Sequence, residues 1–302
     1  MTGKTIIFSS WIFSSLARQG LSSSTGSPTQ SPPIFYRDRL AISVTAVLLA
    51  AAGLAWVASY YLMPFMMMSS PPGMMAATGV VAIVSSLSLP SIAFFEVVWI
   101  IGMAAMMFPA MIPMVFFYDK IKTKVESNPR LAKILGTPLF LAGYLATYAL
   151  FGLAAYLAVY FAISLSSALP VLASLSVAAS ATILIGTGLY QFSSLKTRCM
   201  SNCVSPLGFF TAHSYGGLTG AFRMGFSHGK FCTVCCSAYM LVMLAVGAMS
   251  IPVMLALTGV IALEKVIIRG ATWFNRIIAV AFILLGILVL LFPSLLSAIQ
   301  TL

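Results

Sequence analysis

Charged residues are scarce in this sequence, and acidic residues most of all. Only 5 of the 302 residues are Asp or Glu, and only 2 are His. Charged residues amount to 7% of the chain, against about 25% in an average soluble protein. The sequence has no paired catalytic carboxylates, no Ser-His-Asp set and no nucleotide-binding motif. These absences argue against hydrolase or phosphoryl-transfer chemistry and exclude an ATP-driven pump on this chain alone, so we do not expect an enzyme of these classes.

Nonpolar residues, by contrast, form long runs. They make up 61% of the chain, and several runs exceed the roughly 20 residues that a membrane-spanning helix needs. The expected fold is therefore all-α, a polytopic helical membrane bundle in contact with the lipid bilayer. The sequence predicts seven transmembrane helices, at residues 40–62, 94–118, 135–163, 170–192, 226–249, 251–268 and 274–299. The apolar stretch 76–90 is short and broken by serines and a proline, so we interpret it as re-entrant or interfacial, with an eighth span as the alternative.

The start of the chain differs in composition from the rest. Its only apolar run, 5–16, is too short to span a membrane, and residues 20–33 are mostly Ser, Thr, Gly and Pro. We expect residues 1–36 to be a flexible or interfacial segment and residues 37–302 to be the membrane-embedded domain. A cleaved signal peptide is the alternative for the first residues.

Lys and Arg residues indicate the orientation in the membrane. In the seven-span layout all 16 of them fall on one side, before the first span and between spans two and three, four and five, and six and seven. Basic residues collect on cytoplasmic loops, so we predict a multi-pass protein of the cell membrane with its N-terminus inside and its C-terminus outside. The net charge of +11 is then explained without a nucleic-acid partner.

Cysteines are few but close together: Cys199, Cys203, Cys232, Cys235 and Cys236. The first two are four residues apart, so on a helix they share one face. The last three follow His228 at i+4, i+7 and i+8 and form one stripe on a second helix. Five thiols cannot form a complete set of disulfides. Thiolates with an imidazole suit Cu(I) or Zn(II), so the spacing predicts a metal site from these five cysteines and His228. A thiol redox role is the alternative.

A longer pattern surrounds the cysteines. It consists of Tyr190-Gln191, Leu195-Lys196, Cys199-x3-Cys203, Ser205-Pro206-Leu207, Gly220, Arg223-Met224-Gly225, His228-Gly229, Cys232-x2-Cys235-Cys236 and Glu264-Lys265, with a second block at Trp99, Met103, Ala105-Met106-Met107 and Pro109. Over roughly residues 99–276 the sequence resembles a family of predicted metal-binding integral membrane proteins that is often named copper chaperone. It departs from that pattern at Phe231, where Tyr is expected, and at Ser237, where Trp is expected. The resemblance implies a metal, with copper as the expected one.

Methionines are the second source of sulfur. Met103, Met106 and Met107 lie on one face of the second predicted span, and thioethers select soft Cu(I). We interpret them as a possible copper relay, with ordinary apolar packing as the alternative. Further methionines crowd the predicted outer loop, at residues 63–75.

Glu264 and Lys265 are candidates for supporting the metal ligands. Glu264 is expected to orient His228, and Lys265 to extend toward the membrane surface. The alternative for both is an interfacial charge pair, and the alternative for His228 is a hydrated histidine near the cytoplasmic end of the fifth span.

The sequence therefore predicts a membrane protein that acquires or delivers Cu(I) through a Cys/His site with a Met relay. Its partner would be a membrane copper enzyme or a copper carrier, and zinc is a possible second metal. Two other functions stay open. One is a membrane thiol–disulfide oxidoreductase that uses Cys232 and Cys235, and the other is a non-catalytic subunit of a membrane copper-enzyme complex.

Overall fold

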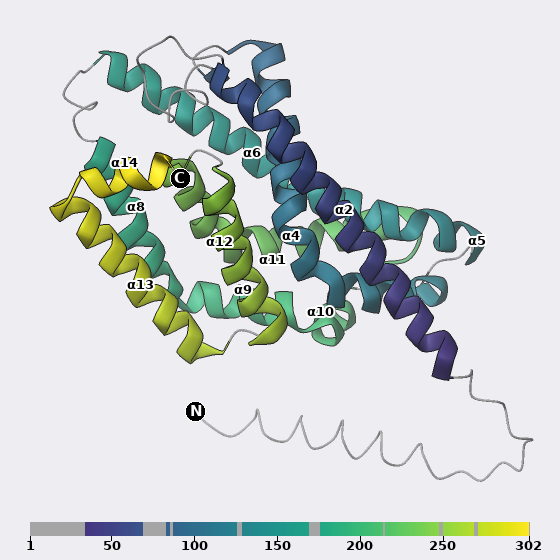
Figure 1. Cartoon of the computed structure of the whole chain (residues 1–302). Helices are drawn as coiled ribbons and strands as arrows, with labels where there is room; N and C mark the ends of the chain where they lie inside the picture. The colour runs from purple at the N-terminus through teal and green to yellow at the C-terminus, as the bar shows by residue number, and fades with distance from the viewer. Residues whose placement is uncertain are drawn as a thin grey trace, which may run out of the picture. The chain divides into compact units, whose positions relative to one another are not determined.

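The structure is a computed structural model that describes residues 34–68, 83–84, 87–125, 129–168, 176–213, 215–247, 250–268 and 271–301. The described elements are helices, as the sequence predicts (Figure 1). The chain divides into two compact units, residues 1–40 and residues 41–302, and the second unit carries the features described below. The predicted N-terminal segment 1–36 falls almost wholly outside the described residues and stays a prediction, as does the role of the methionines at residues 63–75.

The helices follow one another in the order given by their labels in Figure 1. They are α2 (Ile34–Met68), α4 (Leu89–Val125), α5 (Pro129–Leu131), η1 (Ala132–Gly136), α6 (Thr137–Ala168), α8 (Ser176–Gln191), α9 (Ser194–Val204), α10 (Pro206–Ala212), α11 (Leu218–Val242), η2 (Met243–Gly247), α12 (Ile251–Ala262), η3 (Leu263–Ile267), α13 (Thr272–Leu291) and α14 (Ser294–Thr301). The three η segments are π-helical turns, of which η1 leads into α6, η2 extends α11 and η3 extends α12.

In the part of the chain that the structure describes, five helical stretches are long and apolar enough to cross a membrane. They are Ile42–Leu62, Leu89–Lys122, Ala132–Leu165, Leu218–Ala245 and Thr272–Leu291. The prediction of a helical protein with membrane-spanning segments is therefore confirmed in outline. The predicted spans 170–192 and 251–268 coincide with α8 and with α12 and η3, which are shorter. The count of seven and the orientation of the termini stay predictions, and most of the stretch 76–90 lies outside the described residues.

Two details of the predicted layout were wrong. The last span was predicted to continue to residue 299, but α13 ends at Leu291 and α14 starts only at Ser294. Pro293 lies in this break, and proline has no backbone N–H with which to continue a helix. The connection between the fourth and fifth predicted spans is also not a plain loop, because it folds into α9 and α10.

Serine caps define the starts of the short helices. The Ser193 side chain accepts a hydrogen bond from the backbone N–H of Lys196 at the start of α9. Ser205 and Ser250 do the same for α10 and α12, and in both helices a proline follows within the first turn. Such caps satisfy backbone donors that have no partner inside the helix. They fix where α9 begins and therefore which way its two cysteines face.

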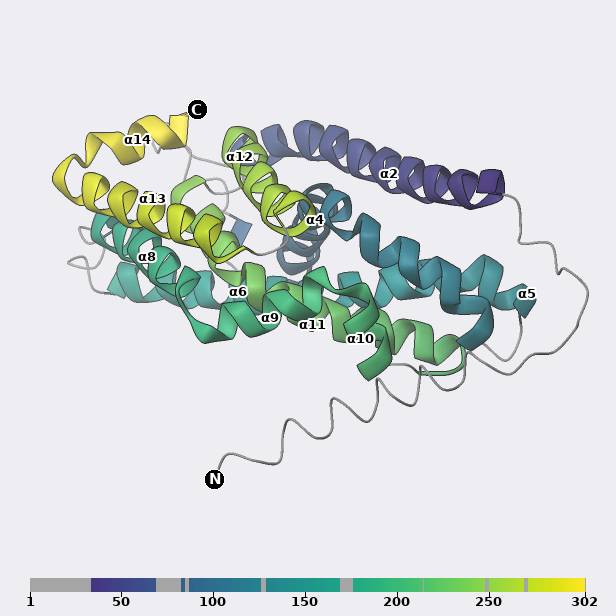
Figure 2. The same ribbon diagram turned by 90° about the horizontal axis from the view of Figure 1, so that it is seen from below.

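Glycines allow α6 and α11 to pack in direct backbone contact. A Cβ atom at Gly225 would collide with the carbonyl oxygen of Phe140, and one at Gly229 would collide with the Thr147 hydroxyl. Small residues permit this close approach between membrane helices. α11 packs against α6 and also against α9, which lies beside it in Figure 2, and α4 packs against α6. The contact places the aromatic residues of α6 directly against the cysteine stripe of α11.

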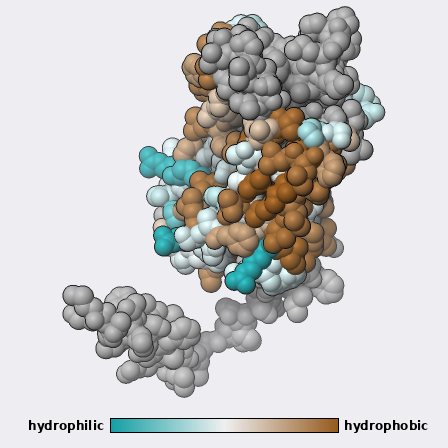
Figure 3. Space-filling view, turned by 90° about the vertical axis from the view of Figure 1, so that its left-hand side faces the viewer, coloured by the Kyte–Doolittle hydropathy of each residue, from teal (hydrophilic) through white to brown (hydrophobic). Residues whose placement is uncertain are grey.

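The surface of the bundle is largely apolar where the long helices face outward. Figure 3 shows a continuous hydrophobic area on one side of the molecule, with hydrophilic groups at its edges. On α13, Ile277, Leu284 and Leu291 are each more than half exposed. A large exposed apolar area is what a lipid-facing surface requires, and it agrees with the apolar composition of the long helices.

Candidate metal centre

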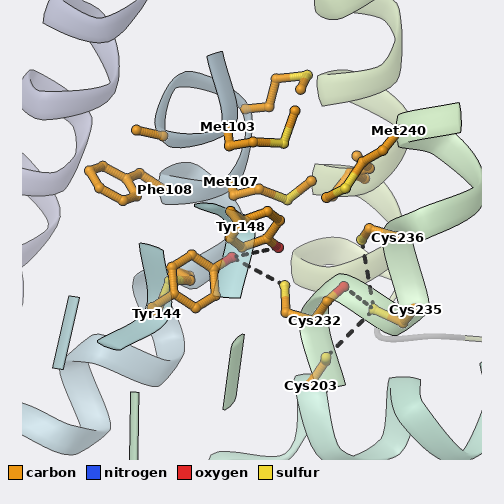
Figure 4. Packing of buried hydrophobic residues seen from close by; sticks show 14 of the residues in the cluster. Met103, Met107, Phe108, Tyr144, Tyr148, Cys203, Cys232, Cys235, Cys236 and Met240 are labelled. Atoms are coloured by element: carbon orange, nitrogen blue, oxygen red, sulfur yellow. Dashed lines mark hydrogen bonds between the residues drawn. The ribbon is translucent and has the colours of Figure 1, made fainter. Parts of the chain in front are cut away.

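The cysteines come from two helices that meet inside the bundle. Cys203 lies near the end of α9, and Cys235 and Cys236 lie in the middle of α11. The Cys203 Sγ is 3.6 Å from the Cys235 Sγ, which is 3.7 Å from the Cys236 Sγ (Figure 4). Each of the five cysteines is at most 9% exposed, and all are free thiols. The fold therefore brings the sulfur atoms of Cys203 and Cys236 to that of Cys235.

Cys232 adjoins the other thiols and has two further partners, a lysine and a tyrosine. The Lys265 Nζ is 2.8 Å from its sulfur, and the Tyr144 hydroxyl is 3.1 Å from the same atom. Tyr144 in turn lies 3.2 Å from the Tyr148 hydroxyl. A cation at hydrogen-bonding distance favours the thiolate form of a cysteine. The expectation that Lys265 extends toward the membrane surface was therefore wrong, because this side chain is buried and directed at a thiol.

Cys199 is the cysteine least involved in the cluster. It lies one turn before Cys203 on α9, and within the described residues its sulfur forms no hydrogen bond with another thiol. Burial raises the pKa of the Cys199 thiol, so this group carries its proton at neutral pH. A metal ion that recruits it would have to displace that proton.

His228 is buried among aromatic rings one turn before Cys232. Its ring centroid is 5.2 Å from that of Phe209 and 5.8 Å from that of Tyr144, which stacks on it. The side chain is 2% exposed, and its Nδ1 has no hydrogen-bond partner. The interpretation of a hydrated surface histidine was therefore wrong, because α11 begins at Leu218 and so places His228 well inside the helix.

Glu264 does not orient His228, contrary to expectation. It forms an ion pair with Lys196, with 2.6 Å between Nζ and Oε1, and its other oxygen accepts a hydrogen bond from the Tyr239 hydroxyl at 3.0 Å. Lys196 also donates to Tyr239 at 3.1 Å and to Gln191. This network of hydrogen bonds and one ion pair joins α8, α9, α11 and η3 next to the cysteines. The sequence pattern contains Lys196 and Glu264, but it gives no sign that they meet.

The methionines of α4 face the same interior. Met103, Met106 and Met107 are 0–2% exposed and belong to one buried cluster with the cysteines and with Met240 of α11. Figure 4 shows Met103, Met107 and Met240 on one side of this cluster and the cysteine sulfurs on the other. Met240 was missed, although it continues the cysteine stripe four residues after Cys236.

The donor atoms that this interior offers to a metal ion are mainly soft sulfur atoms. Within the described residues, no three His, Cys, Asp or Glu side chains are already placed as a closed metal site. Sulfur atoms bound to one ion at about 2.3 Å lie roughly 3.8 Å apart at a tetrahedral angle. The two measured separations around Cys235, 3.6 Å and 3.7 Å, are close to this value.

The fold and this interior define a class: a helical protein with membrane-spanning segments and a buried group of free thiols. Comparison with protein-family models identifies the family. The model of the copper chaperone family PpoB2 matches residues 96–289, and the chain belongs to this family. The matched region runs from the first part of α4 almost to the end of α13, and it contains the five cysteines and Met103, Met106, Met107 and Met240. Comparison with curated proteins gave no match, and neither did comparison with solved structures.

Proposed function

We propose that this protein binds Cu(I) at the buried thiols and passes it to a copper enzyme or copper carrier in the same membrane. The observation that carries the proposal is the 3.6 Å separation between the sulfurs of Cys203 and Cys235, which come from different helices. Two thiols this close without a disulfide form a natural pair of ligands. Copper is the ion named by the family, and thiolates are the donors that favour its monovalent form.

The charges around the site support a bound cation held by several thiolates. Two or three thiolates around one Cu(I) leave a net negative charge inside a bundle that excludes water. A buried charge is tolerated only when it is compensated. Lys265, with its Nζ 2.8 Å from the Cys232 sulfur, supplies that compensation. Two further lysines are buried, and both are already paired, Lys196 with Glu264 and Lys122 with Asp119.

In this proposal the metal ligands are Cys203, Cys235 and Cys236, with Cys232, Cys199 and His228 as further donors. The buried methionines of α4 supply thioethers next to them and form the relay by which copper arrives. In the predicted orientation, the cysteines lie on the cytoplasmic half of the bundle and the predicted outer loop carries the other methionines. Copper would then move inward along α4 before it reaches the thiolates. Zinc is the competing metal with which copper binding is compared.

A thiol–disulfide oxidoreductase is less well supported. Such an enzyme needs a thiolate that a second protein or a small disulfide can reach. Cys232 and Cys235 are 3% and 1% exposed. The described structure therefore favours a ligand role for these thiols over an exchange role. A non-catalytic subunit of a copper enzyme would differ from a free chaperone by co-purifying with that enzyme in mild detergent.

The test is elemental analysis of protein purified under reducing conditions and supplied with Cu(I) or Zn(II). Wild-type protein should hold stoichiometric copper and prefer it to zinc. Cys235→Ser should abolish stoichiometric binding, because a hydroxyl cannot replace the shared thiolate for Cu(I). Cys199→Ser is the matched control and should lose less, since its sulfur lies outside the close group. Full copper retention in Cys235→Ser together with loss of thiol exchange would favour the redox function instead.

A further inference from the structure

Two adjoining hollows lie on the face of α11 that points away from the cysteines. The first has a volume of about 320 Å³ and is lined by Tyr215, Phe222, Arg223, Phe226, Ser227 and Lys230. The second has a volume of about 490 Å³ and is lined by Leu139, Leu218, Thr219, Phe222 and Arg223. They share Phe222 and Arg223, so the hollow that contains both cations continues into a more apolar one. Their volumes fall in the range of about 300–1,000 Å³ that is usual for small-molecule sites.

The two cations have no acidic partner in the described part of the chain. Arg223 and Lys230 are seven residues apart and thus on one side of α11, both exposed, and neither forms an ion pair there. Lys230 lies over the ring of Phe226, with its Nζ 5.6 Å from the ring centroid. A rise of 1.5 Å per residue separates the two positions by roughly 10 Å along the helix. An anion of the size of a phosphate headgroup fits between them.

Close packing against α6 shapes the wall between the cations. A Cβ atom at Gly143 would collide with the backbone of Phe222 and Phe226, so this part of α11 is pressed onto α6. The two phenylalanine rings stack on each other at 6.3 Å, with 17° between their planes. They form a fixed apolar surface beside the cations, next to Leu139 of α6 and Leu218 of α11.

We propose that these hollows bind one anionic phospholipid, with its phosphate between Arg223 and Lys230 and an acyl chain along Leu139, Leu218 and Phe222. Three observations favour a lipid over other anions. The hollow with the two cations opens into a more apolar one, as an amphipathic ligand requires. Both cations lie in the N-terminal half of the apolar stretch Leu218–Ala245, and long basic side chains there extend toward the headgroups of the nearer leaflet. Finally, this is the side on which the basic residues collect, and anionic lipids attract such residues.

The lipid site is separate from the copper site. Ser227 lines the first hollow, the one with both cations, whereas the ring of the next residue, His228, stacks on that of Tyr144 in the interior. Arg223 belongs to the sequence pattern around the cysteines, but its side chain takes no part in the thiol group. Lipid binding and copper binding can therefore succeed or fail independently, and the measurements below keep the two apart.

The experiment is native mass spectrometry of the delipidated full chain with added phosphatidylglycerol or phosphatidylcholine. Wild-type protein should bind one phosphatidylglycerol much more tightly than phosphatidylcholine. The double variant Arg223→Gln/Lys230→Gln should weaken phosphatidylglycerol binding about thirty-fold, from roughly five-fold for each basic residue at an anionic surface. The control variant Lys133→Gln/Arg198→Gln removes the same charge from exposed positions on the same predicted side and should change binding less than two-fold.

Three results would overturn the proposal. An equal loss in both double variants would mean general electrostatic attraction without a site. Equal affinities of wild-type protein for the two lipids would mean that the cations do not select the anionic headgroup. Displacement of the lipid by an equal concentration of inorganic phosphate would define a site for free anions. Copper content, measured on the same samples, should be unchanged in both variants.

Discussion

Lys196 and Glu264 form an ion pair inside the bundle, with 2.6 Å between Nζ and Oε1 and side chains that are 0% and 1% exposed. The pair joins α9, which carries Cys203, to η3, which carries Lys265. Tyr239 of α11 closes the triangle by contacting both groups. Through Tyr239 the pair also links α9 to α11, the two helices that carry the thiols.

Removing one member of this pair should destabilise the protein strongly. Lys196→Met leaves Glu264 without its cation, and breaking a buried pair costs about 3–5 kcal/mol. The double variant Lys196→Met/Glu264→Leu should recover much of that loss, because no uncompensated charge remains. Thermal unfolding in detergent measures both. Arg198→Met, an exposed position on the same helix, should change stability by less than about 0.5 kcal/mol. Additive losses in the double variant would show that the two groups do not interact.

Lys265→Met should weaken copper binding without removing any sulfur. The ammonium group compensates thiolate charge at Cys232, and a hydrogen bond to a charged group contributes about 1.5–3 kcal/mol. We therefore expect affinity for Cu(I) to fall by roughly ten- to one-hundred-fold, as measured by competition with a Cu(I) chelator. Lys230→Met removes an exposed cation from α11 and serves as the control. Equal affinities for wild type and Lys265→Met would place Cys232 outside the copper site.

Met103→Leu should separate a copper relay from simple packing. The substitution nearly conserves volume and should cost less than about 1.5 kcal/mol of stability. If the thioether passes copper to the cysteines, loading of apo protein in liposomes should slow several-fold while the final copper-to-protein ratio is unchanged. Loading is followed as that ratio over time after Cu(I) is added. A wild-type rate would assign Met103 to apolar packing alone.

The predicted orientation can be tested with single introduced cysteines. Ser69→Cys should react with a membrane-impermeant thiol reagent in intact cells, and Thr123→Cys should react only after the membrane is opened. The buried native thiols provide a low background, which is measured on the parent protein. The reverse labelling pattern would invert the topology and, with it, the direction proposed for copper.

The sequence predicted the parts of this structure that depend on periodicity. Helical spacing placed Cys199 with Cys203, and it placed His228 with the three cysteines of α11. Apolar runs located the five long helices. Pro293 could also have been used to predict where the last long helix ends. Because proline has no backbone N–H, the break between α13 and α14 lies at this residue.

The sequence could not supply the partners of buried charges. Spacing along one helix says nothing about which residue of another helix will face it. Glu264 was therefore assigned to His228, although it pairs with Lys196, and Lys265 was assigned to the membrane surface, although it contacts Cys232. These pairings depend on how α9, α11 and η3 meet in three dimensions. The glycine contacts between α6 and α11 determine part of that geometry, and they become visible only once both helices are placed.

The burial of the thiols also bears on how long an ion would stay. Because Cys203 lies on α9 and Cys235 on α11, with neither more than 9% exposed, an ion between them can leave only when the two helices separate. Its residence time would then follow the rate of that opening and not the strength of the metal–sulfur bonds. A chelator in solution would remove such an ion slowly however tightly it bound copper. A receiving protein that pulled α9 away from α11 would remove it quickly.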